Sequence, residues 1–282
     1  MFSYIIGLFA VLLFFSSHIS QYIYPQSSPA RRNLSERPQL NESLLAINRP
    51  NDTAPECPPD TYIAHILNSA PLVIYLENFL SEDERQHLLD ISNPLFEPST
   101  ISNDGHATIH DPSIRDSSIA LIPRTNPTLC IERRALSLQG YRRDVWLERL
   151  RTQRYGPGGH YSHHFDWTRN SGGWGRVSSF MAWVDADEGL VGGGTEFPML
   201  RGRSDLKGNI CKFVECPTEG QEVGDEQGEE KGTVFKVIPG NAVYWENFAA
   251  DGRGYDETWH AALPVEKGVK VGLNIWTFGR IE

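Results

Sequence analysis

The chain has 282 residues, of which 39% are hydrophobic and 22% are charged, and its formal net charge is −10. This length and composition suit one folded domain with an N-terminal extension. The sequence contains no basic patch, so we do not expect nucleic acid as a partner.

The N-terminal segment, residues 1–24, is predicted to be a signal peptide or a signal anchor. Met1–Ala30 contains no Asp, Glu, Lys or Arg, and Tyr4–Phe15 is an unbroken apolar run. This run suits a signal-peptide core, and residues 4–24 together approach the length of a membrane anchor. We therefore expect the chain to enter the secretory pathway and to reside in the lumen of the endoplasmic reticulum. Basic residues at 31, 32 and 37 favour the cytosolic side for this end, and the sequence leaves cleavage open.

Residues 25–60 are predicted to form a linker or stalk, because they are polar, contain proline and are nearly without aromatic residues. Glycosylation sequons begin at Asn33, Asn41 and Asn51, whereas the C-terminal half of the chain has none. Such a cluster in an exposed segment of a secretory protein indicates N-linked glycans.

The four cysteines allow three pairings. Cys211 and Cys216 are close in sequence and flank a loop, which favours that disulfide and leaves Cys57 to pair with Cys130. An oxidising lumen permits both bonds.

Residues 61–150 are predicted to be an α/β region that supports the following domain. Pro71–Leu76 has the composition of a strand, and Ser81 followed by acidic residues caps a predicted helix. We expect two further helical pieces, at Cys130–Gln139 and Asp144–Arg151.

Strand signals dominate residues 151–282, where β-branched and aromatic residues alternate with Gly, Pro and Asn punctuation. The expected strands are Val177–Val184, Thr233–Ile238, Ala242–Asn247 and Val271–Phe278. The expected fold is mainly β with flanking helices, a double-stranded β-helix or jelly-roll. The acidic stretch at residues 218–232 is expected to be a solvated insertion between strands, with a binding role as the alternative.

A candidate metal site consists of His164, Asp166 and His260. Two histidines and one carboxylate can occupy one face of Fe(II) and leave the other positions open. On a strand, His164 and Asp166 would project from the same face. Lys270 offers a fixed cation to a second, anionic ligand, and a turn centred on Val265 would place His260 and Lys270 on adjoining strands.

Four ordered segments resemble the fungal, lumenal type of prolyl 4-hydroxylase within the Fe(II)/2-oxoglutarate-dependent dioxygenases. They are Arg154–Asp166, with Tyr-x-x-Gly and His-x-Asp elements, Gly193–Pro198, Ile238–Trp245 and His260–Lys270. The resemblance implies that Lys270 binds 2-oxoglutarate and that ascorbate serves as a reductant.

The resemblance also implies that Tyr155, Thr195 and Trp276 lie beside the co-substrate, and that Tyr161 and Arg176 contact the substrate. Plain core packing is the alternative for the aromatic residues. His163 should point to the opposite strand face and be structural. The sequence departs from the family where a third glycine stands before Thr195, in place of an acidic residue, and it carries no separate peptide-binding domain.

We therefore expect an enzyme that hydroxylates prolyl residues in a protein or peptide. The alternatives are an oxygenase acting on another side chain or on a small metabolite, and a non-catalytic binding module. The sequence leaves the substrate sequence and the oligomeric state open.

Overall fold

The structure is a computed structural model that describes residues 39–41, 43–48, 54–103, 107–168, 173–201, 210–216 and 232–281. The chain divides into two units, Met1–Arg37 and Pro38–Glu282, and the description below concerns the second. The predicted targeting segment, the linker up to residue 38, the sequons at Asn33 and Asn51, and the acidic stretch at 218–231 lie outside the described residues. Among the described residues, no helix is both long enough and apolar enough to cross a membrane.

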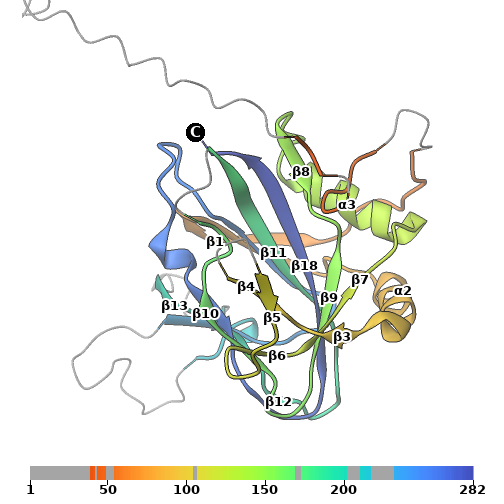
Figure 1. Cartoon of the computed structure of the whole chain (residues 1–282), viewed down its shortest axis with the longest axis vertical. Coiled ribbons are helices and arrows are strands. Elements are labelled where there is room, and N and C mark those ends of the chain that lie inside the picture. The colour runs from red at the N-terminus through yellow and green to blue at the C-terminus, as the bar shows by residue number, and fades with distance from the viewer. Residues whose placement is uncertain are drawn as a thin grey trace, which may run out of the picture. The chain divides into compact units, whose positions relative to one another are not determined.

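An antiparallel sheet of nine strands forms the centre of the fold (Figure 1), in the order β1-β2-β15-β11-β18-β9-β7-β3, with β8 also paired to β18. Its strands are β1 Ile63–Ser69, β2 Leu72–Glu77, β3 Glu97–Pro98, β7 Ser118–Leu121, β8 Val145–Leu147, β9 Arg151–Tyr155, β11 Trp174–Ala186, β15 Ala242–Glu246 and β18 Lys270–Arg280.

A second antiparallel sheet has the order β14-β13-β16-β10-β6. Its strands are β6 Arg115–Asp116, β10 His160–His164, β13 Thr195–Arg201, β14 Gly232–Phe235 and β16 His260–Ala262. Two short pairs complete the strands, β4 Ile101–Asn103 with β5 Ala107–Ile109 and β12 Val191–Gly192 with β17 Val265–Lys267. The helices among the described residues are α2 Glu82–Ser92 and α3 Asn126–Leu138, with 3-10 turns η1 Asn93–Leu95, η3 Ile210–Lys212 and η4 Asp256–Thr258.

Side chains alternate across the central sheet and build a separate apolar core on each face. On β15, Ala242 and Tyr244 face the core that contains residues of α2 and α3, whereas Val243 and Trp245 face the core shared with the second sheet. This alternation follows from the two-residue period of a strand. The mainly β fold with flanking helices is confirmed, and the helices cover one face of the central sheet while the second sheet packs against the other (Figure 1).

The predicted helix start at Ser81 is confirmed by a reciprocal capping box, in which the Ser81 side chain accepts from the Glu84 backbone N–H and the Glu84 carboxylate accepts from that of Ser81. The helix predicted at Asp144–Arg151 is wrong. Val145–Leu147 is strand β8 instead, and it pairs with Thr277–Gly279 of β18. Pairing with a long strand therefore overrides local helix propensity in this segment.

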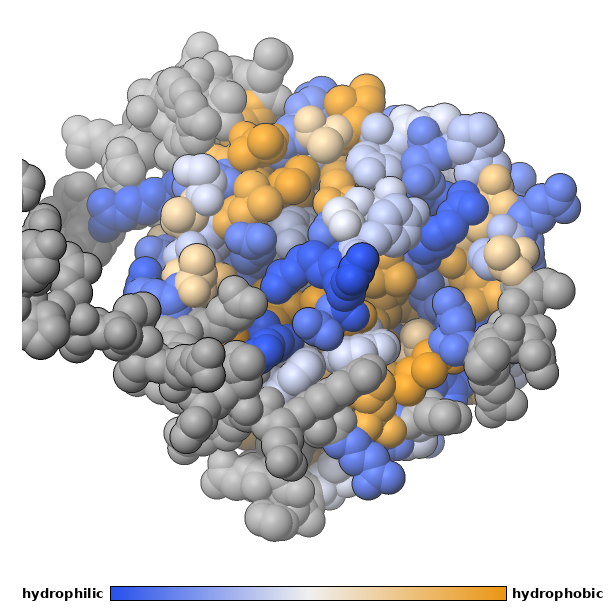
Figure 2. Space-filling model, turned by 90° about the horizontal axis from the view of Figure 1, so that it is seen from above, coloured by the Kyte–Doolittle hydropathy of each residue, from blue (hydrophilic) through white to orange (hydrophobic). Residues whose placement is uncertain are grey.

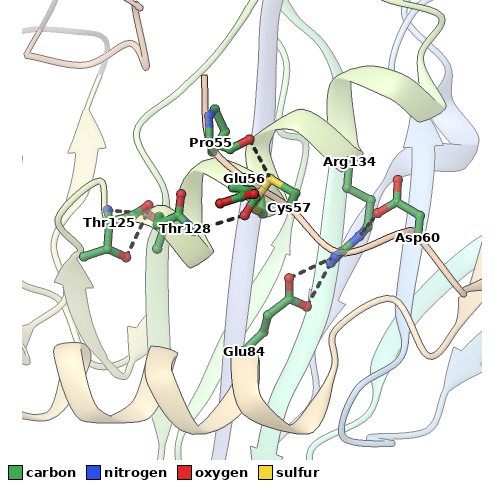
Figure 3. Close-up of a disulfide and its surroundings, with 10 residues drawn as sticks. Pro55, Glu56, Cys57, Asp60, Glu84, Thr125, Thr128 and Arg134 are labelled. Atoms are coloured by element: carbon green, nitrogen blue, oxygen red, sulfur yellow. Dashed lines mark hydrogen bonds and ion pairs between the residues drawn. A yellow bond between two sulfur atoms is a disulfide. The ribbon is translucent and has the colours of Figure 1, made fainter. Parts of the chain in front are cut away.

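Both predicted disulfides, Cys57–Cys130 and Cys211–Cys216, are present. The first attaches the end of the linker to α3, close to the buried Arg134 (Figure 3). The Arg134 guanidinium bonds Asp60 at 2.6 Å and Glu84 of α2 at 2.9 Å. The linker, α2 and α3 are thus held together by one covalent bond and one buried ionic cluster.

Exposed apolar side chains are scattered over the described surface, for example Ile66 on β1, Tyr141 after α3 and Val191 on β12. On the face seen in Figure 2, a band of strongly hydrophilic side chains separates groups of apolar ones. Scattered exposure of this kind is ordinary for a folded domain.

Candidate active site

The predicted metal ligands come together between the two sheets. His164 ends β10 and pairs directly with His260 on β16. The Nε2 atoms of His164 and His260 lie 3.9 Å and 4.0 Å from the two carboxylate oxygens of Asp166. One ligand atom from each residue can be chosen so that all lie within 4.8 Å of one another. The expectation that Asp166 also lies on the strand is wrong, because β10 ends at His164 and a bend turns the carboxylate toward the histidines.

Backbone carbonyls fix the orientation of both imidazoles. Nδ1 of His164 bonds the Ser162 carbonyl and Nδ1 of His260 bonds the Thr258 carbonyl, each at 2.8 Å. Nε2 is therefore the nitrogen that each ring presents to Asp166. Outer contacts of this kind fix the tautomer of metal-binding histidines, so the donor set fits Fe(II).

The electrostatics of the site favour a neutral His164 and an ionised Asp166, the states in which these two groups bind a metal. Burial and the neighbouring His260 lower the pKa of His164 to about 3. Burial alone would raise the pKa of Asp166, but His260 and the Arg176 guanidinium hold it below its ordinary value. Neutral imidazoles and an ionised carboxylate are the forms that coordinate metal ions.

Lys270 lies fully buried on the inner face of β18, directly opposite Tyr155 of β9. Its Nζ donates to the carbonyl of Gly193 and lies 4.7 Å from the centre of the Tyr155 ring. Burial lowers the pKa of Lys270 to about 7. Since Lys270 forms no ion pair within the described part of the chain, its ammonium group is suited to the carboxylate of a bound ligand.

The prediction that His260 and Lys270 lie on adjoining strands is wrong. His260 belongs to β16 in the second sheet, where its neighbours are β10 and β13. The segment Val265–Lys267 pairs with β12, and Lys270 then begins β18 in the central sheet. The chain crosses between sheets here because β16 takes its hydrogen bonds from the second sheet, leaving β18 to pair with β9 and β11.

Thr195 is the first residue of β13 and lies two positions after Gly193, whose carbonyl accepts the hydrogen bond from Lys270. The side chain is buried, and Oγ1 has no hydrogen-bond partner among the described residues. A buried hydroxyl without a partner is destabilising unless a ligand satisfies it. The Thr195 hydroxyl without a hydrogen-bond partner and the Lys270 ammonium group without an ion-pair partner therefore both fit the carboxylate of 2-oxoglutarate. Tyr155, the third residue expected here, is buried and donates from its hydroxyl to Gln153 at 2.6 Å.

The two predicted substrate residues both lie at the metal site. The Tyr161 ring stacks on His164 with 3.7 Å between ring centres. Arg176 makes two hydrogen bonds to Glu148, at 2.6 Å and 3.0 Å, and its Nη1 lies 3.8 Å from Asp166. Trp276, which was expected beside the co-substrate, contacts the metal site instead. Its indole N–H donates to Asp166 at 2.9 Å, and its ring lies under the Arg176 guanidinium.

His163 points away from the metal site, as expected. Its side chain is exposed, and its Nε2 lies 2.7 Å from the Glu196 carboxylate.

Sequence reasoning missed two arginines, Arg115 and Arg151. Arg115 lies 4.7 Å from the centre of the Tyr161 ring, and Arg151 lies 5.7 Å from that of Trp276. Neither residue belongs to a local motif. Strand pairing between distant segments brings these two arginines to the site, and a single sequence carries no signal for that pairing.

Two antiparallel sheets that enclose a two-histidine, one-carboxylate triad define a non-haem metal site in a double-stranded β-helix. Residues 150–278, a little less than half of the chain, match the model of the 2OG-Fe(II) oxygenase superfamily.

Curated relatives include prolyl 4-hydroxylase subunit alpha-1 of Bos taurus, 29% identical over 74% of this chain and 35% of its own length. Subunit alpha-3 of Rattus norvegicus is 25% identical over 75% of this chain and 34% of its own length. The chain thus spans about a third of the length of these relatives.

Among solved structures, the viral collagen prolyl hydroxylase of Paramecium Bursaria Chlorella virus-1, in its 2OG complex, has a TM-score of 0.50 at 20% identity. That match covers 73% of this chain and 96% of the viral one. At this identity the likeness supports the fold.

Proposed function

We propose that this chain is an Fe(II)- and 2-oxoglutarate-dependent dioxygenase that hydroxylates prolyl residues of a protein or peptide. The observation that carries the proposal is the convergence of His164, Asp166 and His260, together with the unpaired, buried Lys270. A degenerate binding module would be under no chemical requirement to keep all four groups in this arrangement.

Each residue has a defined task in this proposal. His164, Asp166 and His260 hold iron, and Lys270 with Thr195 binds the far carboxylate of 2-oxoglutarate. Iron and 2-oxoglutarate, when bound, supply the oxidising chemistry that converts dioxygen, 2-oxoglutarate and substrate into hydroxylated product, succinate and carbon dioxide. The Trp276 indole keeps Asp166 aimed at the metal, while Tyr161 and Arg176 stand where a substrate meets the site.

Prolyl residues are proposed as the target because the curated relatives are prolyl 4-hydroxylase subunits. The same relationship supports ascorbate as the reductant that restores the iron after uncoupled turnover.

The lumen of the endoplasmic reticulum is the proposed location. Two disulfides join all four cysteines, and such bonds persist in oxidising compartments. Asn41 is an exposed sequon asparagine whose Oδ1 accepts hydrogen bonds from the backbone and hydroxyl of Ser43. The apolar segment at residues 4–24 would act as an anchor or a cleaved signal.

The test is succinate release by the full chain, loaded with Fe(II) without oxygen and then given 2-oxoglutarate, ascorbate and air. Reactions with and without a poly-proline peptide are followed by mass spectrometry. Succinate release stimulated by the peptide, with one added oxygen on proline, supports the proposal. Succinate without peptide modification keeps the oxygenase and rejects prolyl peptides as substrates. Folded, iron-loaded protein without turnover would support a binding module.

The matched variants are His164→Ala and His163→Ala, since these neighbours point to opposite sides of β10. The first should abolish turnover and the second should preserve it, because His163 bonds Glu196 outside the ligand set. Loss of activity in both variants with equal loss of bound iron would contradict the ligand assignment.

A further inference from the structure

Strand pairing places an arginine at the far end of the row of side chains that contains the co-substrate lysine. On β18, Lys270 is opposite Tyr155, and Asn274 is opposite Arg151. Paired residues project from the same face of an antiparallel sheet. Arg151 therefore lies on the inner face, in the same row as Tyr155, and points to the side that contains the metal site.

Arg151 has no anionic partner of its own. Its guanidinium makes no hydrogen bond or ion pair within the described ranges, and its Cζ lies 5.7 Å from the centre of the Trp276 ring. Burial and the neighbouring Arg176 and Arg115 disfavour its charge, and Glu148 gives partial compensation. Glu148 is itself engaged by two hydrogen bonds from Arg176. A partly buried cation in this setting is stabilised when a ligand supplies a carboxylate.

Arg115, on β6 of the second sheet, adds a second incompletely paired guanidinium within electrostatic range of Arg151. It is 7% exposed and packs against Tyr161, and its Nη2 is buried with no hydrogen-bond partner among the described residues. The chain as a whole carries a net charge of −10. The positive character here is therefore local to the site and does not reflect a generally basic protein.

The carboxylate that Lys270 binds is not the anion that Arg151 would bind. Four residues separate Lys270 from Asn274 along β18, which at about 3.3 Å per residue corresponds to roughly 13 Å. The two cations therefore stand at separate positions along this row, so that one carboxylate group does not serve both. Arg151 lies beside Trp276, which bonds Asp166, and within electrostatic range of Arg176, one of the two residues proposed to meet the substrate, so its anion is assigned to the substrate.

We propose that Arg151, supported by Arg115, binds the carboxylate of an acidic side chain in the substrate, so that this enzyme selects acidic peptides. The acidic residue lies within about two positions of the target, because a longer extended spacer would carry it away from Trp276. This inference rests on the proposed peptide hydroxylation. It adds to the proposed prolyl target an acidic residue close to it in the substrate.

The test compares three blocked peptides, acetyl-Gly-Ser-X-Pro-X-Gly-Ser-amide, in which both X residues are Glu, Gln or Lys. Binding to the full chain is measured without oxygen, with Zn(II) in place of iron and 2-oxoglutarate present, and turnover is measured separately with Fe(II). A charge-assisted pair predicts that the Glu peptide binds at least about tenfold more tightly than the Gln peptide. The Lys peptide should bind most weakly.

Variants of β9 assign the effect. Arg151→Gln should reduce the preference for Glu over Gln to less than about threefold, Arg151→Lys should restore part of it, and Arg151→Glu should favour the Lys peptide. Arg154→Gln is the control, because Arg154 lies on the same strand with opposite orientation and contacts Phe96. All variants should retain the wild-type affinity for 2-oxoglutarate and unfold at a similar temperature.

The outcomes separate this inference from the proposed function. Tight binding of the Glu peptide without hydroxylation would support acidic recognition and reject prolyl hydroxylation of that sequence. Equal binding and hydroxylation of the Glu and Gln peptides would support the function and overturn the inference. A preference for Glu that survives in Arg151→Gln, or equal loss of preference in Arg154→Gln, would also overturn it.

Discussion

Replacement of Lys270 by methionine should make the protein more stable and, at the same time, unable to bind its co-substrate well. Lys270 is fully buried, and burial lowers its pKa from 10.5 to about 7. In the unfolded chain the amine keeps its ordinary pKa and binds a proton more tightly. At pH 7 this difference costs about 4 kcal/mol of folding free energy.

The sign of the pH dependence follows from the same difference. Between pH 7 and about 10 the unfolded chain holds more protons than the folded one, so this contribution stabilises the fold as the pH rises. Methionine has no proton to lose and fills a similar volume. Allowing about 1 kcal/mol for the lost hydrogen bond to Gly193, Lys270→Met should stabilise the free protein at pH 7 by about 3 kcal/mol.

Binding of 2-oxoglutarate should respond in the opposite direction. The carboxylate requires the ammonium form, so the dissociation constant of the wild type should change little between pH 6 and 7. Above pH 7 it should rise about tenfold per unit. In Lys270→Met the affinity should fall at least about 100-fold, because a buried carboxylate is left without its partner.

The assays are urea unfolding of the metal-free protein at pH 7 and 9, and calorimetric titration of 2-oxoglutarate into the Zn(II)-loaded protein. Wild-type affinity that stays constant from pH 6 to 9 would refute the lysine's role as the carboxylate anchor. A variant that is less stable than wild type at pH 7, with unchanged pH dependence, would refute the assignment of a buried, strained amine.

Further predictions concern the metal and the scaffold. Trp276→Phe removes the N–H bond to Asp166 and should lower Fe(II) affinity about 10- to 100-fold in a chelator competition, with little change in unfolding temperature. Removing the disulfide that spans 73 residues, in Cys57→Ser, should cost about 4 kcal/mol in urea unfolding. Cys211→Ser opens a loop of separation 5 and should cost about 2 kcal/mol, so equal losses would contradict the loop-entropy argument. Arg134→Met leaves the carboxylates of Asp60 and Glu84 without their cation and should destabilise the fold by about 3–5 kcal/mol. The loss should be largest at neutral pH, where both carboxylates are ionised. A loss below about 1 kcal/mol would show that the cluster is not coupled to folding.

Strand alternation and capping explain which parts of the fold could be predicted from the sequence. The segments around Val177–Val184 and Val271–Phe278 became β11 and β18, because they are rich in β-branched and aromatic residues and their flanks carry turn residues. The cap at Ser81 is a local signal that depends on four consecutive residues. Such features require no knowledge of distant segments.

The errors arose where partners far apart in the sequence decide the structure. Val145–Leu147 is a strand because β18 extends beyond β9 and accepts a second partner. His260 and Lys270 lie in different sheets although ten residues separate them, since β16 pairs with β10. Spacing and residue type were sufficient to select the triad, whereas Arg151 became visible only through its pairing with Asn274.

The alternation along β18 limits how this site can evolve. Val271, Leu273 and Ile275 form the helix-side core, while Lys270 and Trp276 face the site. Inserting or deleting one residue between them would exchange the two sets, exposing apolar side chains to the ligand cavity and burying the cation in the core. Substrate preference can therefore drift by substitution at the inward positions of β18 and β9, but the length of β18 is fixed by the core that it shares with α2 and α3.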